Sequence, residues 1–299
     1  MTWGDPKGLA RLHPARTAYG GSHGFEEEKR ALEVSLEAGV NLFDTAAMYS
    51  LGAAERRLGE LARGKDVLIA TKYPSGFSFK EADFPKELDA TLARLGRASI
   101  DLYQHHYPNA RLSIPKLMGR VADGIEAGKI KAVGVSNYSA EQMREAHAAL
   151  AKRGIPLASN QVEYSLLHRQ PETNGVLDAC RELGITLIAY SPLAGGMLTG
   201  KYSAQNRAGG FFRRILPQYS RKAMDALQPV LGLLRTIGEK YSKTPSQVAI
   251  RWLIENPSVL PIPGAKNSQQ ATENTGALSF SLTPEEVEML NQATMAWRV

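Results

Sequence analysis

The stretch from Ala132 to Gly154, AVGVSNYSAEQMREAHAALAKRG, contains one complete strand–helix unit. Its first residues, Ala132–Ser136, form a short valine-rich run that predicts a strand. An amphipathic pattern over residues 139–152 then predicts a helix, with Ser139 suited to its N-cap and Gly154 to its left-handed end. A strand that leads directly into a helix is the building unit of a parallel sheet.

The same unit recurs along the chain at a spacing of roughly 30 residues. Other strands are expected at Val40–Asp44, Val67–Lys72, Asp101–His106, Ala158–Val162, Thr186–Tyr190 and Val259–Ile262. Other helices are expected at residues 25–38, 52–63, 84–96, 115–128, 171–183 and 244–255. Seven such units, without a Gly-x-Gly-x-x-Gly turn after an early strand, favour an α/β fold of the (β/α)8 TIM-barrel type over an open doubly wound sheet. The first strand would be short and lie within Met1–Gly4.

Composition agrees with one globular unit over residues 1–299. Apolar residues make up 43% and charged residues 22% of the chain, which excludes a disordered or collagen-like protein. Barrels of this size are commonly single domains. The net charge is +6, but the basic residues are scattered, so no nucleic-acid partner is expected. No apolar run is long enough to span a membrane.

The single cysteine bears on the compartment. Cys180 cannot form an intramolecular disulfide, and its helical surroundings suggest a buried, unreactive thiol. The N-terminus has no apolar signal core. A cytoplasmic location is therefore expected, with a processed organellar form as the alternative.

Titratable side chains stand where several strands are expected to end. In a barrel these ends share one rim, which would bring Asp44, Lys72 and the His105–His106 pair together, with Tyr49 in the loop after Asp44. A phenol with a pKa of about 10 is a weak acid at neutral pH, but an adjacent ammonium lowers that pKa. A carboxylate could keep a buried lysine charged, and a histidine could orient a carbonyl oxygen. Each residue alone has a structural explanation, whereas the set suits proton transfer to a developing alkoxide.

The segments that carry these residues resemble the aldo-keto reductase family. The stretch FDTAAMYSLGAAERRLGE, from residue 43, is similar to the family signature D-T-A-x-x-Y-x-x-G-x-x-E-x-x-L-G. Further similar segments are ATKY, DLYQHHYP, GKIKAVGVSNYS, NQVEYSLLHR, AYSPLAGGMLTGKY and PIPGAKNSQQATEN. The resemblance covers about residues 24–290. It implies a barrel that binds NAD(P)H across the rim and reduces aldehydes or ketones to alcohols.

The resemblance assigns a catalytic tetrad, which consists of Asp44, Tyr49, Lys72 and His106. His106 is preferred over His105 because it lies five residues after Asp101, as in the family. Successive side chains also point to opposite faces of a strand, so only one of the two histidines can face the site.

The resemblance also assigns the cofactor site. Ser136, Asn137 and Gln161 would hold the nicotinamide carboxamide, and Tyr190 would stack on the ring, although capping and packing are alternatives for these residues. The pyrophosphate would lie against Ser191, Leu193, Gly195, Leu198 and Lys201, under a long loop that extends to about residue 220. The adenosine end would meet Gly264, Lys266, Asn267, Gln270, Glu273 and Asn274, in and beside a short extra helix over residues 267–276. NADPH is the expected cofactor, with NADH possible because no arginine lies between Arg251 and Arg298.

The N-terminal segment and the binding partners are the remaining features on which the resemblance bears. Family members usually begin with a hairpin and a full first strand, of which MTWGDPKG looks like only the tail, so two strand edges are expected to be incompletely paired. The partner would be a small-molecule carbonyl substrate, and no metal is expected. The alternatives are a cofactor-binding regulatory subunit similar to potassium-channel β subunits, and a metal-dependent barrel hydrolase, for which clustered histidine and carboxylate ligands are missing.

Overall fold

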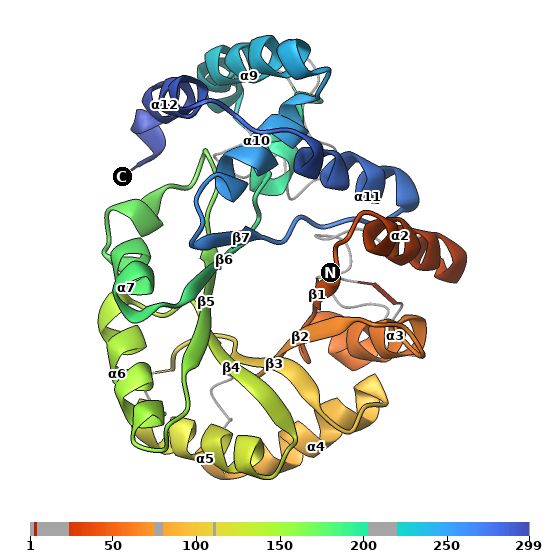
Figure 1. The fold of residues 1–299 in the computed structure, drawn as a ribbon, viewed down its shortest axis with the longest axis vertical. Coiled ribbons are helices and arrows are strands. Elements are labelled where there is room, and N and C mark those ends of the chain that lie inside the picture. The colour runs from red at the N-terminus through yellow and green to blue at the C-terminus, as the bar shows by residue number, and fades with distance from the viewer. Residues whose placement is uncertain (1–2, 5–23, 75–79, 110–111, 203–219, 299) are drawn as a thin grey trace.

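A parallel sheet forms the centre of the molecule. The structure, a computed structural model, describes residues 3–4, 24–74, 80–109, 112–202 and 220–298. Within them the sheet has seven strands, and each strand pairs with the next one in sequence. The strands are β1 (Leu42–Asp44), β2 (Leu68–Tyr73), β3 (Ile100–His105), β4 (Ile130–Ser136), β5 (Leu157–Glu163), β6 (Thr186–Tyr190) and β7 (Val259–Pro261). The sheet curls around an interior, and helices surround it on the outside (Figure 1).

The helices follow the strands in the expected alternation. They are α2 (Phe25–Glu37), α3 (Ala53–Leu61), α4 (Phe84–Leu95), α5 (Ile114–Glu126), α6 (Ala140–Ala151), α7 (Val176–Leu183), α9 (Arg221–Tyr241), α10 (Pro245–Ile254), α11 (Ser268–Thr275) and α12 (Pro284–Ala293). Ser139 caps α6 as expected, because its hydroxyl accepts from the Gln142 backbone N–H at 3.2 Å. The described helices include none long and apolar enough to cross a membrane.

One predicted helix begins later than expected. Residues 171–183 were expected to be helical throughout, but α7 begins at Val176. Pro171 lies in a separate 3-10 turn, and Gly175 before α7 has a φ of 81°. A left-handed residue cannot lie inside a right-handed helix, so the turn and α7 are separate elements.

Strand alternation divides the buried side chains into two sets. The larger set lies between the sheet and its helices and includes Phe43, Tyr103 and Cys180. Cys180 is buried, and burial raises the pKa of its thiol to about 12, which agrees with an unreactive core residue. A smaller set of Ala70, Leu102 and Ile188 lies inside the curled sheet.

The N-terminal segment departs from the expected short strand. Met1 and Thr2 lie outside the described residues, while Trp3 and Gly4 pair with no strand and Gly4 has a φ of 80°. That φ turns the chain out of the extended conformation that a ladder requires. Among the described residues, β1 pairs only with β2 and β7 only with β6, so the expectation of incompletely paired edges agrees with this part of the structure.

Candidate active site

The central feature of the rim is a buried ion pair between β1 and β2. Lys72 is 1% exposed, and its Nζ donates to Asp44 Oδ1 at 2.5 Å and to the Thr45 carbonyl at 2.8 Å. Burial lowers the pKa of Lys72, and the negative charge of Asp44 opposes that shift. The carboxylate therefore favours the charged form of the lysine.

The second oxygen of Asp44 meets two amides inside the barrel. Gln161 on β5 donates to Asp44 Oδ2 at 2.9 Å, and Gln104 on β3 donates to it at 3.3 Å. Gln104 was not among the residues expected in the site. The available signal was its position two residues before His106, which places both side chains on the same face of β3.

Tyr49 reaches the ion pair from the turn between β1 and α3. This turn, the 3-10 segment Tyr49–Gly52, holds Ser50 and Leu51 in left-handed backbone conformations with φ values of 49° and 53°. Such conformations are costly for residues other than glycine and are enriched at functional sites. The turn brings the Tyr49 ring to 5.3 Å from Lys72 Nζ.

The two adjacent histidines lie in different environments. The His106 ring meets the Tyr49 ring edge to face, with centroids 5.8 Å apart. Burial, reinforced by the charge of Lys72, lowers the pKa of His106 to about 4, so its imidazole is neutral at physiological pH. His105 lies on the outer face, where its Nδ1 is 2.8 Å from the Tyr138 hydroxyl and its ring stacks on Tyr73.

A chain of hydrogen bonds joins the residues expected to hold the nicotinamide. Ser136 Oγ donates to the Gln161 carbonyl at 2.8 Å, and Asn137 Nδ2 donates to the His106 carbonyl at 3.1 Å. Tyr190 at the end of β6 donates from its hydroxyl to Asn137 Oδ1 at 3.1 Å. Asn137 has a φ of 60°, which turns the chain sharply after β4. The N-cap of α6 is Ser139, so Ser136 and Asn137 are not needed to cap that helix. The bond from Asn137 to the His106 carbonyl places this group beside the tetrad.

The first expected phosphate segment follows β6. Ser191 and Gly195 are exposed and have left-handed backbones, with φ values of 52° and 65°. Lys201 is also exposed, whereas Leu193 is half-buried and Leu198 is fully buried. The remainder of the expected loop, residues 203–219, lies outside the described residues.

The second expected phosphate segment leads into α11, the predicted short helix. Asn267 caps α11 by accepting from the Gln270 N–H at 2.9 Å, and the Gln270 side chain accepts from the Lys266 N–H at 2.8 Å. Asn274 donates to the Gly264 carbonyl at 3.2 Å and so closes the segment on itself.

Glu273 points toward the start of α10 rather than standing alone on the surface. Its carboxylate accepts from Ser246 Oγ at 2.6 Å and from the Thr244 hydroxyl. The Glu273 carboxylate, which was expected near the adenosine, therefore accepts hydrogen bonds from the start of α10 within the protein itself.

Comparison with known proteins decides the family. The profile described as the aldo/keto reductase family matches residues 15–294. The chain belongs to this family. As an aldo/keto reductase it is an oxidoreductase, and the family and the fold class inferred from the sequence are confirmed.

Individual relatives extend the comparison over nearly the whole chain. An aldo-keto reductase of Strobilurus tenacellus is 37% identical over 94% of this chain and 84% of its own length. The chloroplastic pyridoxal reductase of Arabidopsis thaliana is 39% identical over 90% of this chain and 76% of its own. A relative of Schizosaccharomyces pombe, named as an NADP(+) aldo-keto reductase, is 34% identical over 90% of this chain and 82% of its own. In fold, a glycerol dehydrogenase from Gluconobacter oxydans matches with a TM-score of 0.81 at 24% identity, over 99% of this chain and 88% of that one.

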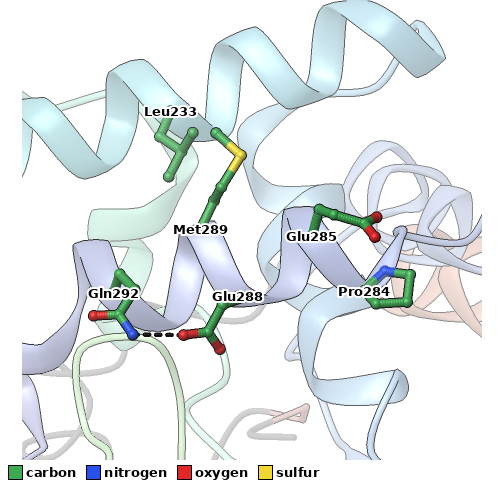
Figure 2. A pocket seen from close by; sticks show the side chains of 6 residues that line it. All are labelled: Leu233, Pro284, Glu285, Glu288, Met289 and Gln292. Atoms are coloured by element: carbon green, nitrogen blue, oxygen red, sulfur yellow. Dashed lines mark hydrogen bonds between the residues drawn. The ribbon is translucent and has the colours of Figure 1, made fainter.

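Two hollows on the outside of the aldo/keto reductase barrel lie apart from the tetrad. One, of about 630 Å³, lies between α9 and α12, where Leu233 and Met289 form an apolar floor beside Glu285 and Glu288 (Figure 2). The other, of about 520 Å³, is lined from α7, α10 and α12 and by the Arg169 side chain. Neither is lined by a residue expected in the catalytic or cofactor site. Among the described residues, no group of three histidine, cysteine or acidic side chains could hold a metal ion.

Proposed function

We propose that this aldo/keto reductase reduces an aldehyde or ketone to the corresponding alcohol with NADPH as the reductant. The observation that carries the proposal is the buried Asp44–Lys72 pair beside the Tyr49 ring, with His106 at the edge of that ring. A tyrosine held against a lysine whose charge is maintained by a carboxylate can act as a proton donor near neutral pH. The relative of Schizosaccharomyces pombe whose name includes NADP(+) supports NADPH as the cofactor.

In this proposal the proton comes from the chain's own residues. Tyr49 donates its phenolic proton to the carbonyl oxygen, and the Lys72 ammonium stabilises the phenolate that remains. Asp44 keeps Lys72 protonated in its buried position. His106 is neutral and can donate one N–H to the same carbonyl oxygen, which orients the substrate.

The cofactor site is supported by the chemistry of its donor set. When bound, NADPH supplies the hydride that the carbonyl carbon receives. Ser136, Asn137 and Gln161 offer the hydroxyl and amide groups that a carboxamide requires, and Tyr190 lies beside them. At the other end Gly264 is exposed, and a Cβ added there would meet nothing within 4 Å, so a phosphate can approach the backbone. Lys266 and the N-terminus of α11 would supply positive charge to a phosphate.

The proposal is tested with Tyr49→Phe, which keeps the ring and removes the proton. The rate of single-turnover reduction should fall by about 10²–10⁴, the usual contribution of general acid catalysis. The NADPH dissociation constant should stay close to the wild-type value, because the phenol faces the substrate. A variant that binds NADPH normally and reduces aldehydes at nearly the wild-type rate would place the acid elsewhere.

The substrate panel should span aromatic, aliphatic and heteroaromatic aldehydes and simple ketones. Pyridoxal belongs in it because one relative is named a pyridoxal reductase. NADPH and NADH are compared in parallel on each substrate. Tight NADPH binding without turnover of any carbonyl compound would contradict the proposed reaction.

A further inference from the structure

Below the tetrad, inside the barrel, lies a glutamine that the proposed mechanism does not use. Gln104 is 0% exposed and has Lys72 on β2 and Gly134 on β4 as its strand partners. A Cβ at Gly134 would lie 2.9 Å from Gln104 Cγ and would also collide with Ser159 Oγ. The absence of a side chain at Gly134 therefore gives Gln104 the room to extend across the interior.

The Gln104 amide is bonded at both of its ends. Its Nε2 donates to Asp44 Oδ2 at 3.3 Å, and its Oε1 accepts from Gln161 Nε2 at 3.3 Å. Gln161 Nε2 also donates to Asp44 Oδ2, so the two amides and the carboxylate form a closed triangle. Asp44 Oδ1 faces Lys72 on the other side.

We propose that Gln104 is a positioning residue that acts on Asp44 and on Gln161 at once. A carboxylate can rotate about its Cβ–Cγ bond, and bonds to Oδ2 fix the plane in which Oδ1 meets Lys72. This inference rests on the proposed function, because Gln104 would orient the Asp44–Lys72 pair that supports Tyr49 as the proton donor. It goes further in connecting the tetrad to the residue expected to hold the cofactor's carboxamide.

The connection follows from the number of donors on an amide. Gln161 Nε2 carries two N–H groups, and its two acceptors, Gln104 Oε1 and Asp44 Oδ2, use both of them. The side-chain oxygen of Gln161, Oε1, is then the atom of this amide that can accept an N–H from a carboxamide. Gln104, together with Asp44, thereby determines which end of the Gln161 amide is presented to the cofactor.

The direct test is Gln104→Leu, which keeps most of the volume and removes both hydrogen-bonding groups. The single-turnover rate should fall about ten-fold or more, as expected for the loss of a hydrogen bond to a charged group. The NADPH dissociation constant should rise by a smaller factor, because Ser136 and Asn137 keep their contacts. Ser159→Ala is the matched control, since Ser159 is buried in the same layer and its hydroxyl has no partner within the described part of the chain. This control should reduce at the wild-type rate.

A second variant shows whether Gln104 acts by positioning Asp44 through a hydrogen bond or only by filling space in the barrel interior. In Gln104→Glu, a protonated carboxyl can still donate to Asp44, whereas an ionised one repels it. Besides Asp44, the titratable groups in this region are Lys72, His106, Tyr49 and Glu55, and they are common to both proteins. The ratio of variant to wild-type rate should therefore fall as pH rises, while the rate of Gln104→Leu should stay uniformly low relative to wild type.

The outcomes distinguish this inference from the proposed function. A folded Gln104→Leu protein with a normal single-turnover rate overturns the inference, even if Tyr49→Phe is inactive. If Gln104→Leu does not fold, a flat pH ratio for Gln104→Glu overturns it instead. An active Tyr49→Phe protein contradicts the proposed acid independently of either Gln104 variant.

Discussion

At the residue scale, two adjacent histidines show how strand geometry separates structure from chemistry. His106 faces the interior beside Tyr49, whereas His105 lies among Tyr73 and Tyr138 on the outer face. Burial lowers the pKa of both imidazoles, to about 3 for His105 and about 4 for His106, so each is neutral at physiological pH. Their surroundings, rather than their charge, distinguish the two side chains.

Alanine at each position should therefore give opposite effects. His106→Ala is expected to lower turnover by roughly 10² with a small loss of stability, because it removes a donor near the carbonyl oxygen. His105→Ala is expected to lower the free energy of unfolding by about 2 kcal/mol or more, since it removes a buried ring and its hydrogen bond. Denaturant unfolding and steady-state assays on both variants check this. If the two effects were exchanged, the assignment of the inner histidine would be wrong.

At the element scale, the sequence predicted the strands better than the helical connections. A buried parallel strand is a short apolar run with a clear polar end, so the end of β2, expected at Lys72 and found at Tyr73, could be placed to within one residue. The start of α7 could not, because the proline at 171 is compatible with both a helix and a separate turn. For Gln104, the spacing from His106 indicated only which face of β3 it occupies. Its hydrogen bonds to Asp44 and Gln161 depend on β1 and β5 lying across the interior, which the sequence of β3 does not show.

The segment before α11 gives a prediction at this scale. Lys266→Ala should weaken NADPH binding about ten-fold or more, the value of one charge-assisted contact to a phosphate, and should leave NADH binding nearly unchanged. Lys129→Ala is the matched control, since Lys129 precedes β4 at the opposite end of the sheet and pairs with Asp89. Titration of both cofactors by fluorescence measures the effect. Equal losses for NADPH and NADH would remove Lys266 from the 2′-phosphate site.

At the scale of the whole molecule, Trp3 connects the two ends of the sheet. Its indole Nε1 donates to the Ala265 carbonyl after β7 at 2.9 Å, and its ring lies 6.5 Å from the Phe43 ring on β1. Gly4 adds a bond from its N–H to the Glu28 carboxylate at 3.1 Å, and Glu28 in turn pairs with Arg57. Since β1 and β7 pair with no strand beyond β2 and β6 in the described residues, these contacts link segments that the sheet leaves apart.

Substitution of Trp3 should therefore act on the stability of the entire barrel. Trp3 is 4% exposed, and Trp3→Ala should lower the free energy of unfolding by about 3–5 kcal/mol, as for other large buried aromatic residues. Trp3→Phe keeps most of the packing and should cost about 1 kcal/mol for the lost hydrogen bond. Urea unfolding followed by circular dichroism measures both values, with Trp297→Phe, a half-buried residue at the other end of the chain, as the comparison. Because Ala265 directly precedes Lys266, Trp3→Phe should also weaken NADPH binding more than Trp297→Phe does. An unchanged unfolding midpoint for Trp3→Ala would mean that contacts other than the Trp3 side chain hold β1 and β7 in place.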